Sequence, residues 1–456
     1  MSEWKKVKIG DICKIVKGTT GIASAEPGEY PLVVTAEERK TCSTYQFDCE
    51  AVCIPLVSSS GHGKKSLKNV HYQSGKFALG TILCAVIPNN PQELDARYLH
   101  QYLQFYKDII LVPLMKGAAN VSLSMKDIAT VEFPLPPIDR QRELSNLFVS
   151  LQEKQKELSA EYEKQTDYAK LLRQNILQDA IEGKLTAAWR KQNPVQKGNP
   201  DYDAEALFEQ IQKGEVSPSL QPASQFSATP SAGSNAARNA RSKTLAPITD
   251  EEKPFEIPEG WKWVRLDFLS TNILYGVSES AKENGKYKLL RITDIQNNFV
   301  DWDTVPYTDF NEAKVNQYLL HKDDILFACT GGTVGKSYLV EDCPSNTIYA
   351  SYLIRVRLTK SINSHFIKSF FESPFYWKQI TDNLVGTGQP NCNGQKLSNL
   401  VLPLPPLKEQ DEIVNKVETL LAKVTTLENQ IQDRKSLSDK LIFGIIKENL
   451  EVKVND

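Results

Sequence analysis

The sequence lacks any apolar run long enough to cross a bilayer, and its first residues lack the apolar core of a secretory signal. A cytoplasmic location, with no membrane partner, is therefore expected. The eight cysteines are scattered along 456 residues and form no Cys-x-x-Cys pair; Cys49 and Cys53 come nearest to one. This spacing predicts no zinc site, because zinc sites need Cys and His ligands clustered at short intervals.

Net charge and histidine are also scarce. The chain has 54 Lys and Arg against 56 Asp and Glu, whereas a protein that coats nucleic acid non-specifically is usually strongly basic. DNA binding would therefore depend on local patches. Only five histidines occur, no nucleophile and base suggest themselves as a pair, and no tetrapeptide of the Asn-Pro-Pro-Tyr type of amino-methyltransferases is found. The sequence thus predicts no catalytic residues.

What the chain does contain is an internal repeat. The segment 133–144, FPLPPIDRQREL, matches the segment 402–413, LPLPPLKEQDEI, 269 residues further on. Each half opens on a similar stretch, which begins at Trp4 in the first half and at Trp261 in the second. The interiors of the two halves diverge. One frame with two different contents favours a device that reads two different targets.

A proline-free segment of about forty residues follows each Pro-rich motif. Its residues can be counted at alternating spacings of four and three, and eight of the ten positions are apolar in each copy. Such a heptad pattern predicts a coiled coil, with one amphipathic helix lying on a globular core as the alternative. The positions are Leu144, Phe148, Leu151, Gln155, Leu158, Tyr162, Gln165, Ala169, Leu172 and Ile176, then Ile413, Val417, Leu420, Val424, Leu427, Ile431, Arg434, Ser438, Leu441 and Ile445.

In the first half, the segment 58–72 carries three lysines and two histidines but no carboxylate. Glycine lets a backbone approach another surface closely, and Ser, His and Lys donate hydrogen bonds to phosphates or base edges. A solvated Gly-rich turn is the alternative. The candidate DNA-binding residues of this half are Ser60, Gly61, His62, Gly63, Lys64, Lys65 and Lys68, with Asn120 from the later segment GAANVS.

In the second half, the segment 327–337, FACTGGTVGKS, nearly matches a phosphate-binding P-loop, but Thr330 stands where the motif needs its first glycine. A turn that presents Thr330, Thr333 and Lys336 to a polyanion is the favoured interpretation, with a P-loop NTPase as the alternative. The segment 383–408 contains no acidic residue and adds the polar candidates Thr387, Gln389 and Asn391. An Asn/Gly turn that caps the following element is the alternative there.

Together with LRQNILQDAIEGKL at 172–185, these motifs resemble the specificity subunit of Type I restriction–modification enzymes. The resemblance implies an α+β fold in which two target-recognition domains each read one half of a bipartite site in double-stranded DNA. They are joined by two long antiparallel coiled-coil helices with a pseudo-twofold repeat. The domains expected are 1–138 and 256–406 for recognition, 139–195 and 407–456 for the helical spacers, and 196–255 for a flexible linker.

The resemblance also implies partners. Two methylation subunits would dock on the helices and bring S-adenosylmethionine, and restriction/translocase subunits would join and use ATP and Mg. No cofactor site is expected in this chain. The second helix lacks the EGKL motif that follows Ile181, so its terminal contacts are expected to differ. Antiparallel packing is expected to set Leu158 beside Ile431 and Gln155 beside Arg434.

Two further classes stay open: a stand-alone DNA methyltransferase, and a structural coiled-coil scaffold that carries two unrelated globular heads. Binding of S-adenosylmethionine or ATP by the purified chain would identify an enzyme. A scaffold would show no sequence-selective DNA binding even with partners present.

Overall fold

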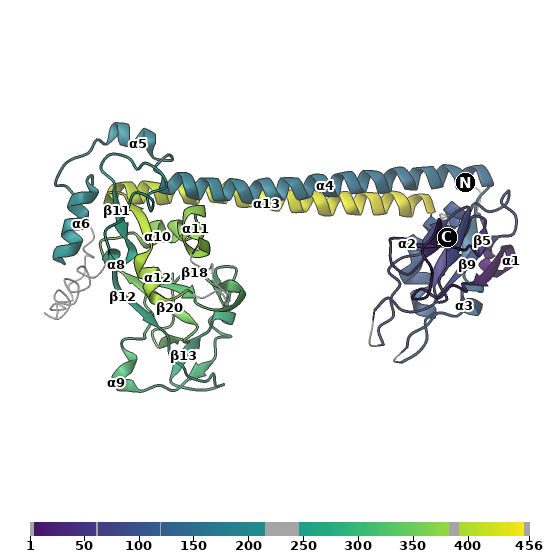
Figure 1. The fold of residues 1–456 in the computed structure, drawn as a ribbon, viewed down its shortest axis with the longest axis horizontal. Helices are drawn as coiled ribbons and strands as arrows, with labels where there is room; N and C mark the ends of the chain where they lie inside the picture. The colour runs from purple at the N-terminus through teal and green to yellow at the C-terminus, as the bar shows by residue number, and fades with distance from the viewer. Residues whose placement is uncertain (1–3, 61–62, 119, 215–245, 383–391, 451–456) are drawn as a thin grey trace, which may run out of the picture. The chain divides into compact units, whose positions relative to one another are not determined.

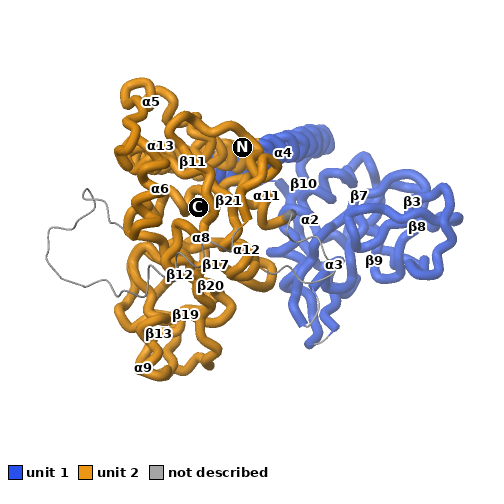
Figure 2. Tube along the Cα trace, turned by 60° about the vertical axis from the view of Figure 1, so that its left-hand side comes forward, with its two compact units in different colours: residues 1–164, 431–456 blue, residues 165–430 orange. Residues whose placement is uncertain are grey.

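The computed structural model describes residues 4–60, 63–118, 120–214, 246–382 and 392–450. They fall into two compact units, residues 1–164 with 431–456 and residues 165–430 (Figure 2). Each unit therefore holds one globular part and one end of each long helix. No helix in these ranges is long and apolar enough to cross a membrane.

Unit 1 is built on a four-stranded antiparallel sheet with the order β2-β9-β6-β7. A second group has the order β4-β3-β8-β5, in which β3 and β8 run parallel. All five residues of β6 are buried, and so are Leu83 to Val86 of β9, as expected for central strands. The strands are β2 (Cys13–Lys17), β9 (Leu83–Pro88), β6 (Ala51–Pro55), β7 (His71–Gln73), β4 (Lys40–Cys42), β3 (Tyr30–Val33), β8 (Lys76–Leu79) and β5 (Phe47–Asp48).

Unit 2 repeats this topology. Its main sheet has the order β12-β20-β17-β18, and a smaller sheet β16-β13-β19 again contains one parallel pair, β13 with β19. The predicted internal repeat is confirmed, and two unrelated heads on a scaffold are not what the chain contains. The strands are β12 (Ser270–Tyr275), β20 (Leu353–Leu358), β17 (Ile325–Ala328), β18 (Ser337–Leu339), β16 (Tyr307–Thr308), β13 (Tyr287–Leu290) and β19 (Thr347–Tyr349).

In each unit, the strand that opens the half pairs with the strand of the Pro-rich motif that closes it. In unit 1, β1 (Lys5–Lys8) runs antiparallel to β10 (Glu132–Leu135), and in unit 2, β11 (Lys262–Arg265) runs antiparallel to β21 (Val401–Leu404). The Trp-containing opening and the Pro-rich motif thus form one short ribbon. The ribbon closes each globular part directly before its long helix begins, which explains why both edges recur.

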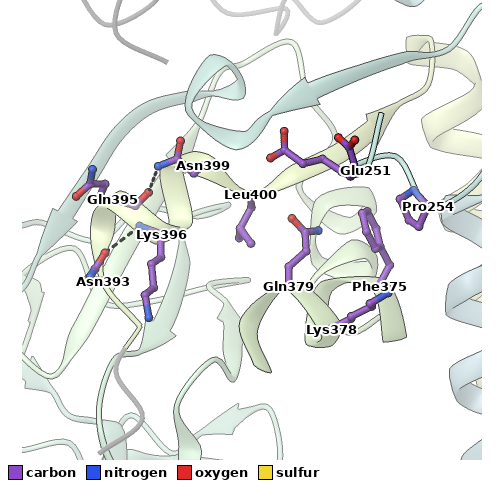
Figure 3. Close-up of a pocket in the computed structure, with 11 residues that line it drawn as sticks. Glu251, Pro254, Phe375, Lys378, Gln379, Asn393, Gln395, Lys396, Asn399 and Leu400 are labelled. Carbon is purple, nitrogen blue, oxygen red and sulfur yellow. Dashed lines mark hydrogen bonds between the residues drawn. The ribbon is translucent and has the colours of Figure 1, made fainter. Parts of the chain in front are cut away.

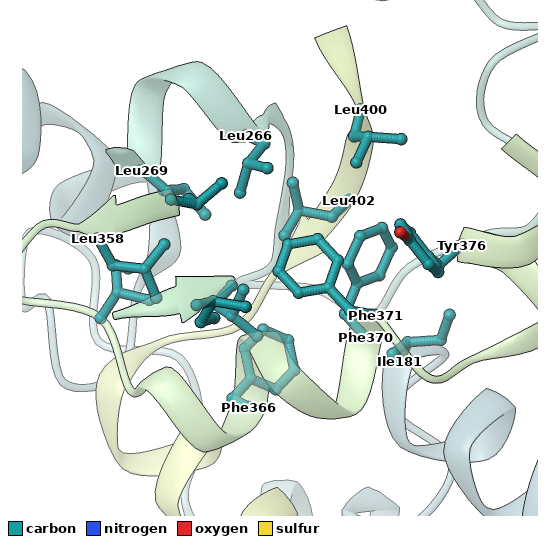
Figure 4. Close-up of a cluster of buried hydrophobic side chains, with 14 of the residues drawn as sticks. Ile181, Leu266, Leu269, Leu358, Phe366, Phe370, Phe371, Tyr376, Leu400 and Leu402 are labelled. Carbon is teal, nitrogen blue, oxygen red and sulfur yellow. The ribbon is translucent and has the colours of Figure 1, made fainter. Parts of the chain in front are cut away.

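Short helices complete the units. They are α1 (Ile9–Ile12), α2 (Ala96–Ile110) and α3 (Met125–Ala129) in unit 1, and α8 (Leu266–Leu269), α10 (Ser364–Phe370), α11 (Pro374–Asp382) and α12 (Gly394–Asn399) in unit 2. Figure 4 shows the core of unit 2, where Phe366, Phe370 and Phe371 pack among Leu266 and Leu402. Ile181, at the end of a long helix, is fully buried in the same core. Helix and globular part are therefore one packed body in this unit.

The two long helices, α4 (Ile138–Ile181) and α13 (Leu407–Leu450), run side by side (Figure 1). In unit 1, Gln155 donates to Asp439 at 3.0 Å and Arg140 donates to Asn449 at 3.1 Å. In unit 2, Arg173 bonds Glu428 at 2.9 Å. Within each unit, later residues of α4 meet earlier residues of α13, so antiparallel packing is confirmed. A single amphipathic helix on a globular core is excluded.

The predicted register is wrong by five residues at this point, because Gln155 faces Asp439 and Arg434 is exposed. At the end of α13, Ile446 and Leu450 pack in the same cluster as Leu144 and Phe148 of α4, and this contact sets the alignment. The prediction assumed that equivalent heptad positions of the two helices face one another. The globular core at the helix end fixes the register instead.

Some of the heptad positions predicted to lie between the two helices are exposed. Leu172, Leu427 and Leu441 are exposed at 43%, 46% and 62%, although the ladder placed them inside. From Val424 onward, every second covered side chain of α13 lies one position later than predicted, at Glu428, Lys435 and Ile442, while Ile431 and Ser438 are covered as predicted. An α-helix has 3.6 residues per turn, so a strict 3.5-residue repeat drifts by about 20° per heptad unless the helix supercoils. Leu144, Phe148, Leu151, Leu158, Ile176, Ile413, Val417, Leu420 and Ile431 do lie in covered or partly covered positions.

The range 196–255 predicted as linker is too wide. Within it, α6 (Ala204–Lys213) buries Leu207 and Ile211 in the core of unit 2, after α5 (Ala187–Gln192). On the other side, Arg265 donates to the carbonyls of Ala246 and Pro247 and to Glu252. Buried apolar and charged groups therefore fix both flanks. This burial could not be predicted from the sequence, because α6 is short and its partners lie far away in the chain.

Candidate nucleic-acid interface

In unit 1 the lysine-rich segment is a compact loop after β6. The Ser58 hydroxyl donates to the carbonyl of Lys64, and the Ser60 and Ser66 hydroxyls lie 2.7 Å apart. Lys64 and Lys65 are exposed, and so is Lys68 further along. The loop therefore presents three cations on an internally hydrogen-bonded turn. Gly61 and His62 lie outside the described residues.

A second loop of unit 1 packs against the first. Gly63 has a φ of +75°, and a Cβ at this position would lie 2.3 Å from the carbonyl oxygen of Ala118. The backbone of Ser58 donates to Val121 at 3.0 Å. Asn120, at the tip of this second loop, is exposed. The structure thus brings together two of the segments that the sequence singled out separately.

In unit 2 the P-loop-like segment is a hairpin. It leaves β17, makes one short turn η4 (Gly331–Thr333), and returns as β18, which pairs antiparallel with β17. A P-loop needs a helix directly after its Gly-Lys-Ser, because the helix N-terminus holds the phosphates. Here Ser337 begins a strand, so the NTPase alternative loses its structural basis.

Lys336 is the exposed cation of this hairpin. Its backbone donates to Thr333 at 3.0 Å, and the hydroxyl of the buried Tyr376 donates to the neighbouring carbonyl of Gly335 at 2.6 Å. Thr333 and Lys336 also border a cavity of about 530 Å³, together with Thr293 among other residues. The turn is thus held from below while its polar side chains face the solvent.

The third candidate segment meets the same hairpin. Cys392 donates its backbone N–H to Cys329 at 3.2 Å, directly before Thr330. The next residue, Asn393, caps α12 by accepting from the backbone N–H of Lys396 at 2.8 Å (Figure 3). The capping turn offered as the alternative for this segment is therefore present. Thr387, Gln389 and Asn391 lie outside the described residues.

Figure 3 shows a cavity of about 540 Å³ beside α12. Glu251, Glu252, Lys378 and Lys396 border it, so its lining carries charges of both signs. Gln379 on its wall is committed to the backbone of Val401, to which it donates at 2.9 Å and from which it accepts at 2.9 Å. This cavity therefore lies between α12 and the chain segment before β11, and its mixed charge does not mark it as a phosphate site.

Reactive side chains in the described ranges are held in unreactive states. His71 is 5% exposed, and burial lowers its pKa to about 4. Burial raises the pKa of the Cys84 and Cys392 thiols to about 12. No group of three His, Cys, Asp or Glu suited to a metal ion occurs among the described residues. These groups provide neither a nucleophile nor a metal centre.

Two exposed aromatic side chains adjoin the hairpin of unit 2, and no sequence motif pointed to either. Tyr352 is 60% exposed, and its carbonyl accepts from the backbone N–H of Cys329 at 3.1 Å. Tyr275 is 44% exposed, and its hydroxyl accepts from the backbone N–H of Gly394 at 3.1 Å. Only the folded chain shows that both lie beside Thr330 and α12.

The long helices carry apolar side chains that the helix pair leaves uncovered. In unit 1, Phe443 is 54% exposed and packs against Phe105 with ring centroids 4.8 Å apart. Both rings border a cavity of about 410 Å³, together with Phe148. The exposed apolar residues of the two helices are Val149, Leu437, Leu441 and Phe443 in unit 1, and Tyr168, Leu171, Leu172 and Leu427 in unit 2.

Comparison with known proteins agrees with this architecture. The chain is 23% identical over 462 residues to the EcoDI specificity subunit of Escherichia coli, covering 97% of this chain and 87% of that one. It is 24% identical over 339 residues to the EcoKI specificity subunit of Escherichia coli K12, covering 73% of this chain and 60% of that one. The match to the EcoAI specificity subunit of Escherichia coli covers 34% of that protein. The chain therefore spans about a third of the EcoAI subunit and 60% of the EcoKI subunit.

Two solved structures share the fold. The HsdS subunit from Thermoanaerobacter tengcongensis aligns with a TM-score of 0.53 at 14% identity, covering 99% of this chain and 97% of that one. A chain from a study of complex assembly and conformational transition of the type I R-M system aligns with a TM-score of 0.64 at 15% identity, covering 100% and 99%. A family model described as the Type I restriction modification DNA specificity domain matches residues 1–165 and 258–434. The chain belongs to the family of Type I restriction–modification DNA specificity domains.

Proposed function

We propose that this chain reads a bipartite site in double-stranded DNA, with one half-site recognised by each unit, as a non-catalytic specificity subunit. The observation that carries the proposal is that both units repeat one arrangement of strands. In each unit, the loop or hairpin after β6 or β17 lies beside a second loop, the one before α3 or α12. The two frames present different side chains. A repeated frame with different contents suits two different half-sites.

The proposed chemistry of reading follows from the residue types. In unit 1, Lys64, Lys65 and Lys68 would contact phosphates, and Asn120 offers an amide for a base edge or a phosphate. In unit 2, Lys336 supplies the cation. Other polar side chains and two glycines complete the proposed set, namely Ser60, His62, Thr330, Thr333, Thr387, Gln389 and Asn391, with Gly61 and Gly63. Phosphate contacts fix the position of the protein on the duplex, while base contacts give specificity.

We further propose that two methylation subunits dock on α4 and α13, and that restriction/translocase subunits join that core. The uncovered apolar side chains of both helices support this, because exposed apolar patches mark protein–protein contacts. Leu437 and Leu441 lie one helical turn apart and would act together. In this assembly S-adenosylmethionine, ATP and Mg belong to the partner subunits. The proposed role requires access to chromosomal DNA and hence a cytoplasmic location.

Mapping of methylated adenines in the host genome, with and without the gene for this chain, tests the proposal. A bipartite motif that disappears with the gene supports it. A motif that persists, or a purified chain that methylates DNA alone, contradicts it. The described sheets are small and mainly antiparallel, which disfavours a stand-alone methyltransferase built on a doubly wound parallel sheet.

A further inference from the structure

The two globular frames can be matched residue by residue through their backbone hydrogen bonds. In unit 1, Leu56 donates to the carbonyl of Ile82 at 2.8 Å. In unit 2, Cys329 donates to the carbonyl of Tyr352 at 3.1 Å in the same place, directly before the candidate turn. Ile82 and Tyr352 therefore occupy equivalent positions, because Ile82 lies just before β9, which pairs with β2, and Tyr352 lies just before β20, which pairs with β12.

A pair of glycines fixes the second equivalence. Gly18 donates to Leu83 at 2.9 Å and Gly276 donates to Leu353 at 3.0 Å. A Cβ on Gly18 would lie 2.2 Å from the carbonyl oxygen of Gly80, and a Cβ on Gly276 would lie 2.2 Å from that of Tyr349. Neither position tolerates a side chain. The residues directly before these glycines, Lys17 and Tyr275, are therefore equivalent as well.

A third pair of bonds ties both positions to the second loop of each unit. Leu123 donates to Leu56 at 2.9 Å, and Cys392 donates to Cys329 at 3.2 Å. The following residues, Ser124 and Asn393, cap α3 and α12 by accepting from the backbone N–H three residues later. The backbone around the candidate loops is thus the same in both units, down to individual hydrogen bonds.

The side chains on this shared backbone differ. Unit 1 has the exposed cation Lys17 and the half-buried Ile82, whereas unit 2 has two exposed tyrosines, Tyr275 and Tyr352. The backbone bonds that hold the sheet do not involve these side chains, although the Tyr275 hydroxyl accepts a bond from the backbone of Gly394. Such positions can alter what is read while the fold stays constant.

We propose that Tyr275 and Tyr352 are specificity-determining residues of unit 2, and that Lys17 and Ile82 hold the same positions in unit 1. The proposal rests on the proposed function, in which each unit reads one half-site. A tyrosine offers a rigid ring for apolar contact with a thymine methyl or a sugar, and a hydroxyl for a phosphate or base edge. Lysine and isoleucine at the same places favour a guanine or phosphate contact and an apolar contact.

Exchange of the two pairs tests the proposal. The full chain, co-expressed with the methylation subunits, is used to select DNA from a library in which both half-sites are randomised. For Y275K/Y352I we expect new base preferences in one half-site and at least a tenfold loss of affinity for the original half-site. The other half-site should stay unchanged. The reciprocal K17Y/I82Y variant should change the other half-site only.

Two controls separate reading from stability. Phe299→Ala removes a matched aromatic ring of unit 2, which is 67% exposed, and should leave both preferences unchanged. The half-site altered by Y275K/Y352I should be the one that Lys336→Ala weakens. Single variants Y275K and Y352I are judged by the same criterion where the double variant does not fold.

Retention of the original base preferences by the exchanged variants, with or without weaker binding, would overturn the inference. A lowered melting temperature with unchanged preferences would show that the tyrosines have a structural role alone. Failure of the wild-type chain to select any bipartite sequence would count against the proposed function instead.

Discussion

Gln141 and Gln410, which lie 269 residues apart, make the same two hydrogen bonds in their respective units. Each donates to the carbonyl five residues earlier, to Pro136 at 2.8 Å and to Pro405 at 2.9 Å. Each also accepts from the backbone N–H of a helix N-cap residue, Asp95 of α2 at 2.9 Å in unit 1 and Asn363 of α10 at 3.0 Å in unit 2. Both side chains are fully buried. The glutamine of the repeated motif thus joins the long helix to the sheet domain.

Gln410→Ala should therefore destabilise unit 2. It would leave the part-buried Asn363 N–H and the Pro405 carbonyl unpaired, at a cost of about 1–3 kcal/mol for each group. Gln410→Glu should also destabilise, because a carboxylate cannot donate to the carbonyl. The exposed Gln430→Ala, on the same helix, is the control. Thermal unfolding of the full chain measures all three, and an unchanged melting temperature for Gln410→Ala would refute this role.

Part of this fold could be predicted from the sequence. The repeat and the two long helices followed from motif spacing and heptad periodicity, and their antiparallel packing followed from the family resemblance. The register did not, because it depends on Leu450 packing against the core of unit 1. Likewise α6 was missed, since Leu207 and Ile211 owe their burial to residues of unit 2 that are distant in sequence.

The candidate site divides in the same way. Lys64, Lys65 and Lys336 were found because cations and glycines cluster visibly in the sequence, and all three are exposed. Tyr275 and Tyr352 were not found, because they lie 77 positions apart in strand ends that carry no motif. A candidate DNA-binding loop can be found in the sequence when its composition is unusual. A reading position on an ordinary strand end becomes visible only through the shared hydrogen-bond frame.

Lys336→Ala should weaken or alter recognition of one half-site. The ATP turnover of the full assembly away from DNA should stay intact, because the hairpin between β17 and β18 has no phosphate-binding helix. The exposed Lys314→Ala, in the same unit, is a matched charge control. Half-site binding and basal ATPase assays report the two properties separately. Loss of basal turnover in Lys336→Ala would restore the P-loop interpretation.

Removal of Ser217–Lys243, or its replacement by Gly and Ser where the ends need the length, should leave the methylated motif unchanged. The segment is poor in apolar residues, so it can stabilise a core only weakly. Arg265→Ala should behave differently, since this buried guanidinium holds Ala246, Pro247 and Glu252. We expect it to lower the stability of unit 2. A shifted motif after the deletion would make the segment part of the reader.

Acid should destabilise unit 1 through His71. The side chain is 5% exposed, Arg39 lies 3.1 Å from its Nδ1, and burial lowers its pKa to about 4. The unfolded chain binds the proton with a pKa of about 6.5, so stability is complete above that pH and falls as the pH drops from about 6.5 towards 4. Each unit of pKa difference corresponds to about 1.4 kcal/mol, which bounds the loss at a few kcal/mol.

His71→Gln should flatten this pH dependence, because glutamine accepts a bond from Arg39 without titrating. Hydrogen exchange of the β7 peptide between pH 7 and pH 4.5 measures the local stability. His365→Gln, in unit 2, is the control and should leave the β7 profile unchanged. An identical acid sensitivity in wild type and His71→Gln would assign the effect to another group.

The last prediction concerns the length of the helix pair. Both α4 and α13 begin in one unit and end in the other, so both must grow together to keep their antiparallel contacts. One heptad inserted into each helix, at the facing positions Gln155 and Asp439, adds roughly 10 Å at about 1.5 Å per residue. Duplex DNA advances about 3.4 Å per base pair, so the unread spacer should lengthen by up to about three base pairs. The half-site sequences should stay the same, because the proposed readers lie in the globular parts.

A heptad inserted into α4 alone is the matched control. It would shift Gln155 and the covered residues before it against α13, separate the ends of the pair and lower stability rather than lengthen the spacer. Methylome sequencing of both variants gives the spacer length directly, and thermal unfolding gives the stability. An unchanged spacer with full methylation in the double insertion would mean that the helices do not set the distance between half-sites. The exposed apolar residues of α4 and α13 would then have to be explained by partner docking alone.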